Sequence, residues 1–528
     1  MGFEVSHLWQ PPVLNPVNKK ARSVPVLNPI DRHGRVFFFS WLGFMLAFWA
    51  WYTFPPLLPV TIKKDLSLTT EQVANSNIIS LVATLLVRFV AGPLCDQFGA
   101  RTVFGMILLL GSIPVGLAPL IKDATGLYII RFFIGILGGS FVPCQVWCTG
   151  WFDKNVVGTA NALSGGWGNA GGGITYFIMP AIYDSLVHHF GHTPGQAWRI
   201  TFVVPLVCLI VCGLGLLLLC DDTPMGKWDE RHRQVKQNML LHGLPGDIVA
   251  ETGSVTDRTS PSGTATLGSD EEKKRSGAAT PRHTTEENTG NEVRGFEHET
   301  NISRTEAIET AQGEIVVRPT FREALSIVCS LHGLFHVATY ACSFGGELAI
   351  NSILGSYYLK NFPSLGQTNA SNYAAIFGFL NFVTRPLGGV VGDVLYNSFG
   401  RSLWLKKIWI HVCGVLTGAL LIVIGVLDPH HLATMVGLIV LMAVFHEAGN
   451  GANFALVPHV FPYANGILSG LTGAGGNLGG VVFAIVFRYM DGGTNYAKGF
   501  WVIGIVHIAL NLAVCWIPPL PRGQIGGH

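Results

Sequence analysis

Hydrophobic runs of about 20 residues recur along the chain and are separated by short polar segments. Each run can cross a bilayer as a helix, since the hydrocarbon core is about 30 Å thick and a helix rises about 1.5 Å per residue. The pattern predicts twelve membrane-spanning helices in two sets of six. The expected spans are 36–60, 73–94, 102–121, 126–150, 157–183 and 198–220, then 326–356, 371–396, 403–426, 430–456, 464–489 and 497–518.

One long polar segment, 221–325, divides the two sets. It contains "ETGSVTDRTSPSGTATLGSDEEKKRSG", which has almost no large apolar side chain and cannot bury enough surface to fold alone. We expect a largely disordered loop, although the density of Ser and Thr also suits phosphorylation. The predicted organisation is a tail (1–35), a six-helix half (36–220), the loop (221–325), a second half (326–518) and a tail (519–528).

Composition agrees with an all-α membrane protein. Charged residues make up 12% of the chain, against roughly 25% in soluble domains. The net charge of +2 argues against a nucleic-acid partner, and the 10 cysteines lie mostly in apolar runs without the spacing of a metal site. The chain carries no nucleotide loop or catalytic motif. We therefore expect no metal, no cofactor and no enzymatic activity.

Basic residues indicate the orientation in the membrane, because cytoplasmic loops are enriched in Lys and Arg. Basic clusters precede the first span and follow the sixth, and Arg101 follows the second. If the spans alternate, all of these positions fall on one side. We expect both termini and the long loop in the cytoplasm, with Lys63 and Lys64 as exceptions on the other side.

The two halves repeat a motif around an arginine. "RFVAGPLCDQFGAR" begins at Arg88, and "RPLGGVVGDVLYNSFGR" begins at Arg385. An aspartate follows each arginine by eight residues, at Asp96 and Asp393, and each copy ends the second helix of its set. The repeat predicts a duplicated architecture, as in secondary transporters built from two rocking halves.

A second repeat, rich in glycine, lies in the fifth helix of each set: "ANALSGGWGNAGGG" and "ANGILSGLTGAGGNLGG". Glycine destabilises a helix in water by about 1 kcal/mol relative to alanine. In a bilayer the helix persists, because no water competes for its backbone, and small residues let another helix approach closely. We predict that the two halves pack and slide on these faces, through Gly168, Gly171, Gly172, Gly475 and Gly476.

These motifs resemble those of a known family. "GPLCDQFGAR" is similar to the loop motif of the major facilitator superfamily, and the paired glycine–asparagine stretches resemble the signatures of its nitrate/nitrite porter branch. The chain looks most like the fungal high-affinity nitrate transporters. The resemblance implies the major facilitator fold with two pseudo-symmetric six-helix halves, proton-coupled uptake of nitrate and nitrite, and a place in the plasma membrane.

Arg88 and Arg385 are the strongest candidates for an anion site. A charge at the centre of a bilayer costs about 2.5–3.5 kcal/mol on insertion scales, and no Asp or Glu lies within one turn of either arginine in its own helix. The repeat predicts that the two side chains face each other between the halves. Two guanidinium groups without an obvious carboxylate favour a planar anion, which accepts paired N–H bonds.

Other residues join the site through the resemblance. Asn169 and Asn477 are expected beside the anion, with hydrogen bonding between helices as the alternative. Phe48 and Tyr340 are expected to form walls that sandwich the anion. Arg131 begins the fourth predicted helix near the membrane edge, and we expect a structural or proton-related role for it.

Three charged residues near the membrane surface are expected to control the conformational cycle. Asp96 and Arg101 are predicted to form a charge latch between helices that changes between inward-facing and outward-facing states. Asp393 would be a weaker copy of this latch in the second half.

Coupling to cations follows from the charge of the transported anion. The membrane potential of an electrically negative cell opposes the entry of an anion by about 2.3 kcal/mol per 100 mV. Uptake therefore needs more than one coupled cation. The resemblance implies protons and a monomeric unit in the lipid bilayer. A nitrate/nitrite exchanger, a nitrate receptor signalling through the loop, and a sugar or drug carrier remain as alternatives. Candidate proton carriers are Glu347, Glu447, His332, His336 and His446.

Overall fold

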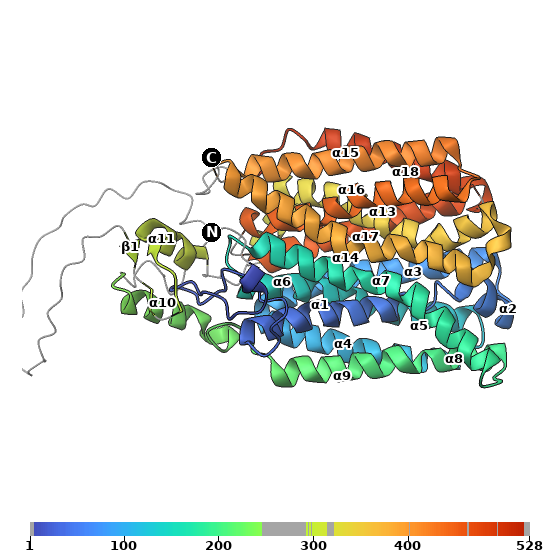
Figure 1. The fold of residues 1–528 in the computed structure, drawn as a ribbon, viewed down its shortest axis with the longest axis horizontal. Helices are drawn as coiled ribbons and strands as arrows, with labels where there is room; N and C mark the ends of the chain where they lie inside the picture. Colours follow the sequence, from blue (N-terminus) through green and yellow to red (C-terminus); the bar gives the residue numbers. More distant parts are fainter. Residues whose placement is uncertain are drawn as a thin grey trace, which may run out of the picture.

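The protein is a single bundle of long helices (Figure 1). The computed structural model describes residues 5–244, 292–293, 295–296, 298–313, 321–400, 402–461, 464–493 and 495–521. The middle of the predicted loop and most of the predicted C-terminal tail lie outside these residues. Both termini lie at the same end of the bundle, which we call the tail end; the opposite end is the far end.

The first half begins with α1 (Arg32–Trp51), whose first turn is capped by the carboxylate of Asp31. This helix ends nine residues earlier than predicted, because Pro55 and Pro56 interrupt it before a short π-helix (Leu58–Ile62) and α2 (Lys63–Asp65). The other helices of this half are α3 (Thr70–Phe98), α4 (Ala100–Leu117), α5 (Ala124–Ile134), α6 (Phe141–Trp151), α7 (Val157–His188), α8 (Pro194–Thr201) and α9 (Val203–Leu219).

The second half follows a short helix, α12 (Phe321–Val328), and its first long helix is capped by the hydroxyl of Ser330. Its helices are α13 (Leu331–Asn361), α14 (Gly366–Ser398), α15 (Leu403–Leu427), α16 (Leu432–Val460), α17 (Asn465–Tyr489) and α18 (Tyr496–Ala513).

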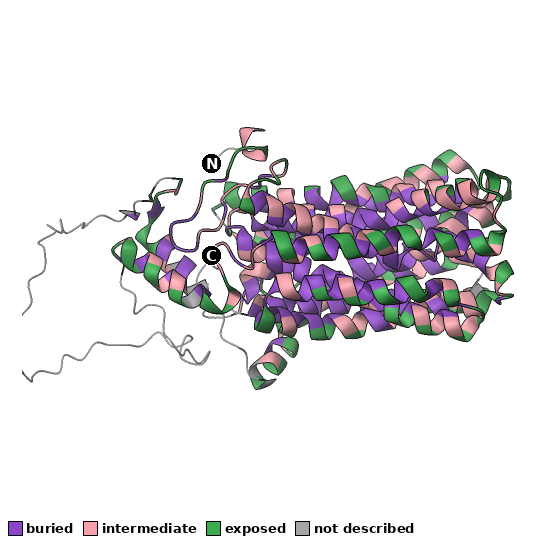
Figure 2. Cartoon of the chain, turned by 90° about the horizontal axis from the view of Figure 1, so that it is seen from below, coloured by how far each residue is buried: buried purple, intermediate pink, exposed green. Residues whose placement is uncertain are grey.

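Long helices of the structure coincide with the twelve predicted spans. Among the described residues, 10 helices or helix pairs are long and apolar enough to cross a membrane. The other two spans are α7, with 32 residues, and α13, with 31, whose glycine and polar residues lower their hydropathy. Exposed positions follow the outer surface while buried ones fill the interior (Figure 2), and the outward positions of α9 are apolar, as lipid contact requires.

The two halves meet along two pairs of long helices, α7 with α14 and α3 with α17, which lie between the other helices in Figure 1. Glycines make these contacts possible. A Cβ atom added at Gly166 would lie 2.5 Å from the Asn381 carbonyl oxygen, and one added at Gly92 would lie 2.6 Å from that of Gly466. Larger side chains at these glycines would force the halves apart.

Most of the glycines predicted for this interface lie elsewhere. An added Cβ at Gly168 or Gly171 would clash with α1, while one at Gly475 would lie 2.9 Å from Val337 of α13 and one at Gly476 would lie 2.8 Å from Tyr340 of the same helix. These four positions therefore pack inside their own halves, and the prediction is wrong for them. Of the five predicted glycines, Gly172 faces the opposite half, where an added Cβ would lie 3.2 Å from the Asn351 amide of α13. Spacing along one helix shows that glycines share a face without showing which neighbour covers it.

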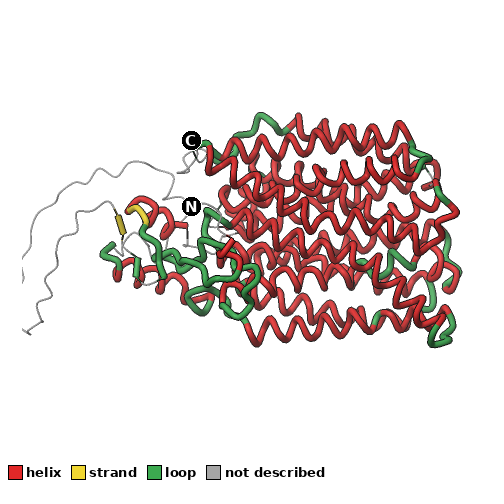
Figure 3. Tube along the Cα trace, in the orientation of Figure 1, coloured by secondary structure: helices red, strands yellow, loops and turns green. Residues whose placement is uncertain are grey.

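The tail end carries a small folded unit, which we call the terminal cap. It combines the N-terminal segment 5–31 with α10 (Arg231–Leu241), the two-stranded sheet of β1 (Glu292–Val293) and β2 (Ile302–Ser303), and α11 (Arg304–Gly313) (Figures 1 and 3). The expectation of a largely disordered loop is wrong for these parts. The apolar core of the cap comprises Val17, Val235, Met239, Leu244, Val293, Ile302, Ala307 and Ala311.

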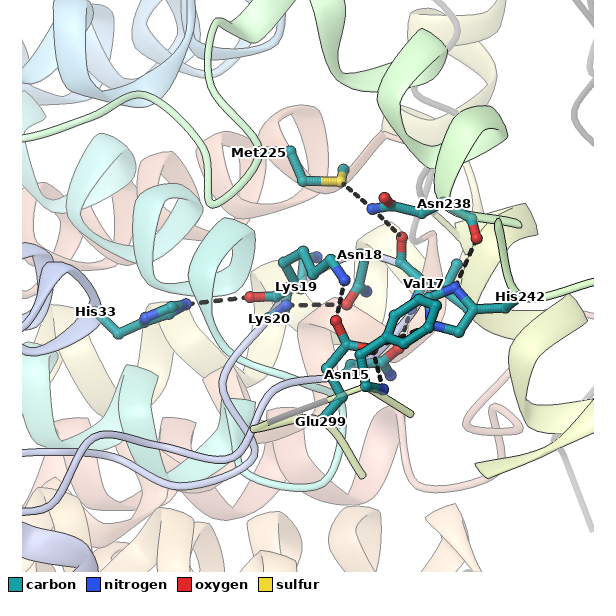
Figure 4. Close-up of polar contacts among 11 residues, drawn as sticks. Asn15, Val17, Asn18, Lys19, Lys20, His33, Met225, Asn238, His242 and Glu299 are labelled. Carbon is teal, nitrogen blue, oxygen red and sulfur yellow. Dashed lines mark hydrogen bonds and ion pairs between the residues drawn. The ribbon is translucent and has the colours of Figure 1, made fainter. Parts of the chain in front are cut away.

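Polar contacts hold the cap together and join it to the bundle (Figure 4). The Glu299 carboxylate accepts a hydrogen bond from Lys19 Nζ and contacts His242 Nε2 at 3.0 Å. His33 of α1 contacts the Lys19 carbonyl oxygen at 3.1 Å, and Asn15 donates to Asp153, between α6 and α7, at 2.7 Å. The N-terminal segment therefore bridges the central loop and the membrane helices.

Candidate functional site

Arg88 and Arg385 are buried at the centre of the bundle and share two aromatic rings. Arg88, on α3, is 0% exposed, and Arg385, on α14, is 1% exposed. The Cζ atom of Arg88 lies 5.0 Å from the ring centre of Phe141 and 4.9 Å from that of Phe344. For Arg385 the distances are 5.4 and 5.7 Å. The repeat thus places the two cations around one aromatic pair.

Arg88 reaches across the interface between the halves. Its Nε donates to the Gly138 carbonyl oxygen of its own half at 2.8 Å, and its Nη1 donates to the Gly473 carbonyl oxygen of α17 at 2.9 Å. Among the described residues, Nη2 has no hydrogen-bond partner. One buried donor of this guanidinium is therefore free for a ligand.

Arg385 is placed in a similar way. Its Nη2 donates to the Tyr340 hydroxyl at 2.7 Å, while Nε and Nη1 have no hydrogen-bond partner in the described part of the chain. An added Cβ at Gly165 of α7 would lie 3.1 Å from Nε. Each glycine-rich helix thus makes room for the arginine of the opposite half, through Gly165 and Gly473.

A carboxylate lies near Arg385, contrary to the expectation that none is close. Glu347 Oε2, from α13, is 3.9 Å from Arg385 Nη1. Its two oxygens also accept hydrogen bonds from Asn381 Nδ2 at 2.9 Å and Asn450 Nδ2 at 2.6 Å. The spacing of residues along one helix could not reveal a carboxylate that another helix supplies. The two arginines therefore have the carboxylate of Glu347 close to one of them.

The two signature asparagines differ in their contacts. Both are buried. Asn477 Nδ2 donates to the Gly473 carbonyl oxygen at 3.0 Å, the same atom that Arg88 contacts, whereas its Oδ1 has no partner. Among the described residues, neither polar atom of the Asn169 side chain has a hydrogen-bond partner. Asn477 therefore orients the Arg88 side of the site, and Asn169 offers an unused buried amide.

The aromatic residues near the arginines are only partly those expected. Tyr340 stacks on Phe344 with ring centres 5.1 Å apart, and it contacts Arg385 directly. Phe48 lies 6.4 Å from Phe344, outside the rings that face the guanidinium groups. Sequence reasoning missed Phe141 and Phe344, because an aromatic residue in an apolar helix carries no local signal that separates a site from packing.

The predicted pairing of Asp96 with Arg101 is wrong. Arg101 Nε instead lies 2.7 Å from Asp222 Oδ1, beyond α9. The Asp96 carboxylate faces the backbone N–H groups of Gly466 and Ile467 at the start of α17. Asp96 thus joins the two halves at the tail end. Its negative charge also stabilises the N-terminus of α17.

Asp393 makes the equivalent contact from the second half to the first half. It accepts hydrogen bonds from Thr159 N at 2.7 Å and Thr159 Oγ1 at 2.9 Å, near the start of α7, and from Lys406 Nζ at 2.8 Å. Its carboxylate accepts from three donors, whereas the Asp96 carboxylate faces two backbone N–H groups. That Asp393 is the weaker latch in the transport cycle stays a prediction.

The far end is also closed between the halves. The Tyr176 hydroxyl donates to the Asn351 carbonyl oxygen at 2.9 Å, and Arg488 Nη2 lies 3.0 Å from Glu71 Oε1. A cavity of about 210 Å³ lies between α3, α13 and α17 on this side, lined partly by Glu71, Asn77 and Arg488. With contacts at both ends and both arginines buried, this is an occluded arrangement.

The remaining candidates lie around the site. Arg131 is 1% exposed, two turns inside α5, and its guanidinium lies 5.5 Å from the ring centre of Phe54. His336 contacts Asn453 at 2.7 Å, and His446 lies against the Ser343 carbonyl oxygen. His332, near the start of α13, is partly exposed at the tail end. These histidines contact groups other than the arginines.

The arrangement is suited to bind a small planar anion. Arg88 and Arg385 present unused N–H donors from opposite halves, aromatic rings surround them, and the halves are in contact at both ends of the bundle. A ligand held by both halves couples binding to their relative motion, which is the requirement for alternating access.

Comparisons with known proteins agree with this architecture. Residues 40–395 match the family model described as Major Facilitator Superfamily. The chain belongs to the major facilitator superfamily, a class of membrane transporters. The predicted fold, an all-α membrane protein of the major facilitator type, is confirmed, and 10 of its described helices or helix pairs are long and apolar enough to cross a membrane.

Its relatives include several nitrate transporters. Elsinochrome transporter 1 of Elsinoe fawcettii is 36% identical over 99% of this chain and 100% of that protein. High-affinity nitrate transporter 2.3 of Oryza sativa subsp. japonica is 29% identical over 92% of this chain and 77% of its own length. Nitrate/nitrite transporter NrtP of Nostoc punctiforme is 27% identical over 94% of both chains.

Proposed function

We propose that this protein imports nitrate, and also nitrite, across the plasma membrane by proton symport, with both termini and the terminal cap in the cytoplasm. The observation that carries the proposal is the set of unpartnered N–H donors on Arg88 and Arg385, buried between the two halves. Nitrate is planar and accepts paired hydrogen bonds from a guanidinium edge. The named functions of the nitrate-transporting relatives support the same substrate.

Symport is favoured over exchange by the charge near the arginines. Glu347 is a buried group that can carry a proton beside Arg385, whereas exchange of one anion for another needs none. Nitrate/nitrite exchange remains the alternative mechanism, and signalling by a receptor-transporter through the central loop is an alternative role. Inward positive current that rises with external acidity, at clamped voltage, would identify symport; strict dependence on internal nitrite without net current would identify exchange.

The relative with 36% identity raises a second candidate substrate, the elsinochrome of its name. The small-anion site described above favours nitrate, and a transport assay decides. In a host without nitrate transport, the wild-type protein should take up labelled nitrate. Arg88→Lys and Arg385→Lys keep the charge but lose the planar fork, and should raise KM by about tenfold or more. The control is Arg32→Lys, an exposed arginine at the tail end.

Two results would contradict the proposal. The first is unchanged nitrate affinity in both lysine variants, which would remove the arginines from the binding site. The second is wild-type protein that reaches the membrane, moves elsinochrome and leaves nitrate untouched, which would assign the substrate of the other relative.

A further inference from the structure

Two glutamates occupy the Arg385 side of the site, on helices of the second half. Glu347 of α13 is 6% exposed, and Glu447 of α16 is 0% exposed. Glu447 precedes Asn450 by three residues, so both side chains lie on the same face of α16, and Glu447 interacts electrostatically with Glu347 and Arg385. Two carboxyl groups and a guanidinium thus form one buried cluster.

The hydrogen bonds of Glu347 suit an ionised carboxylate. Both of its oxygens face amide N–H donors, from Asn381 and Asn450, and Oε2 also faces Arg385 Nη1. An ionised carboxylate only accepts hydrogen bonds, and every partner here donates. The charge of Glu347 therefore holds Arg385 in the absence of another anion.

The hydrogen bonds of Glu447 suit a protonated carboxyl group. The Thr384 hydroxyl contacts both the Leu380 carbonyl oxygen, at 2.8 Å, and Glu447 Oε2. Thr384 Oγ1 is the one hydrogen-bond donor to this carboxyl group within the described part of the chain, and Glu447 Oε1 has no hydrogen-bond partner there. A buried carboxyl group with a single donor is poorly compensated as an anion, which favours its protonated form. The cluster is arranged to hold a proton in addition to its fixed charges.

We propose that Glu347 and Glu447 are the two proton-binding groups of the symport, and that protonation of Glu347 releases Arg385 to bind the anion. This inference rests on the proposed function. A proton from the outer solution adds to a Glu347 oxygen, and the neutral carboxyl group then no longer attracts the Arg385 guanidinium. The free Nε and Nη1 edge then accepts nitrate as a ligand. Release of the proton on the cytoplasmic side restores the carboxylate, which competes with nitrate for the guanidinium.

The charges around the pair are consistent with this exchange of partners. The ionisable groups that act on Glu347 are Arg385, Arg88 and Glu447, with the hydroxyls of Tyr340 and Tyr52 nearby. Two protons entering with one nitrate carry a net charge of +1, so that the membrane potential favours uptake.

Coupling can be separated from binding in liposomes that contain the purified full-length protein. The voltage is clamped at zero, and two quantities are measured: nitrate counterflow at equal pH, and nitrate accumulation driven by a pH step of about one unit. Each coupled proton supports about a tenfold gradient per pH unit. Glu347→Gln and Glu447→Gln should each lower the limiting accumulation by about tenfold or more, and by a larger factor than they change the counterflow rate.

The control is Asp428→Asn, which removes a carboxylate of the same half that accepts a hydrogen bond from Tyr357, away from the arginines. Unchanged pH-driven accumulation in both glutamine variants would overturn the proposal. Equal loss of counterflow and accumulation would also overturn it, because the glutamates would then maintain the site without carrying protons. Absence of wild-type counterflow would refute the proposed function itself.

Discussion

Arg88, in the first half of the molecule, donates a hydrogen bond to the backbone carbonyl of Gly473 in the second half, at 2.9 Å. Arg385 lies against Gly165 in the reverse direction. Each arginine therefore belongs to a helix of one half, and its side chain packs against a glycine of the other half. Glycine leaves room for the arginines at these two positions, where an added Cβ would lie 3.1 Å from Arg385 Nε and 3.3 Å from Arg88 Cδ.

Substitution of Gly165 tests this relationship. Gly165→Val should raise the KM for nitrate by about tenfold, because the added atoms displace Arg385, and hydrogen bonds to charged groups contribute about 1.5–3 kcal/mol. The matched control is Gly437→Val in α16, where an added Cβ meets nothing within 4 Å. Uptake kinetics in the transport-null host provide the measurement, and equal KM values for the two variants would contradict the geometry.

Much of this site could be predicted from the sequence, because the internal repeat identifies equivalent positions. Arg88 and Arg385 were found in this way and Tyr340 through the family resemblance, and the three do lie together. Glu347 and Phe141 were not assigned to the arginines, since contacts between helices far apart in sequence leave no spacing signal. The glycine stretches indicated close packing, but only the structure shows which helix covers each glycine.

The terminal cap was missed for a different reason. Its helices bury few apolar residues, such as Val235 with Met239 and Ala307 with Ala311, each pair spaced by four. That spacing was a signal of an amphipathic face. It was obscured by the polar composition of the segment, and its partner, Val17, comes from the N-terminal segment more than 200 residues earlier.

Phe141 should contribute to anion affinity through both arginines. Phe141→Leu removes a ring about 5 Å from each guanidinium, and a cation–π contact contributes about 0.5–2 kcal/mol. We expect a rise in KM of about 2- to 30-fold. Phe141→Tyr keeps the ring and should stay near wild type. The prediction fails if leucine and tyrosine give the same KM in uptake assays.

Asp393 should affect the transport cycle more than binding. Asp393→Asn removes the charge that pairs with Lys406 and faces the start of α7. The maximal rate of nitrate counterflow should fall by about tenfold with KM changed less than about threefold, since a partly buried helix-end charge contributes up to about 2 kcal/mol. A change confined to KM would place Asp393 in the binding site instead. Asp184→Asn, at the far end, is the control.

The terminal cap should weaken in acid. Burial by itself would raise the pKa of Glu299, but hydrogen bonds from Lys19, from the Phe296 N–H and from His242 bring its pKa below the usual value. A lowered carboxyl pKa stabilises the folded form at neutral pH, and this contribution is lost as the pH falls through the lowered pKa. Hydrogen exchange of α10 and α11 should therefore accelerate between pH 7 and about pH 3, after correction for intrinsic rates.

Glu299→Gln provides the control for that experiment. The variant cannot ionise at this position, so its cap should exchange faster at neutral pH and show a smaller additional change in acid. An identical pH dependence in wild type and variant would show that other groups control the cap.

Equilibrium binding of nitrate to the purified full-length protein tests the central claim most directly. Titration calorimetry on the wild type, Arg88→Lys, Arg385→Lys and the exposed control Arg32→Lys separates binding from transport. We predict that the wild type and the control bind nitrate with the same affinity, and that each buried lysine variant binds about tenfold or more weakly. Nitrate binding of equal strength in all four proteins would contradict the two-arginine site.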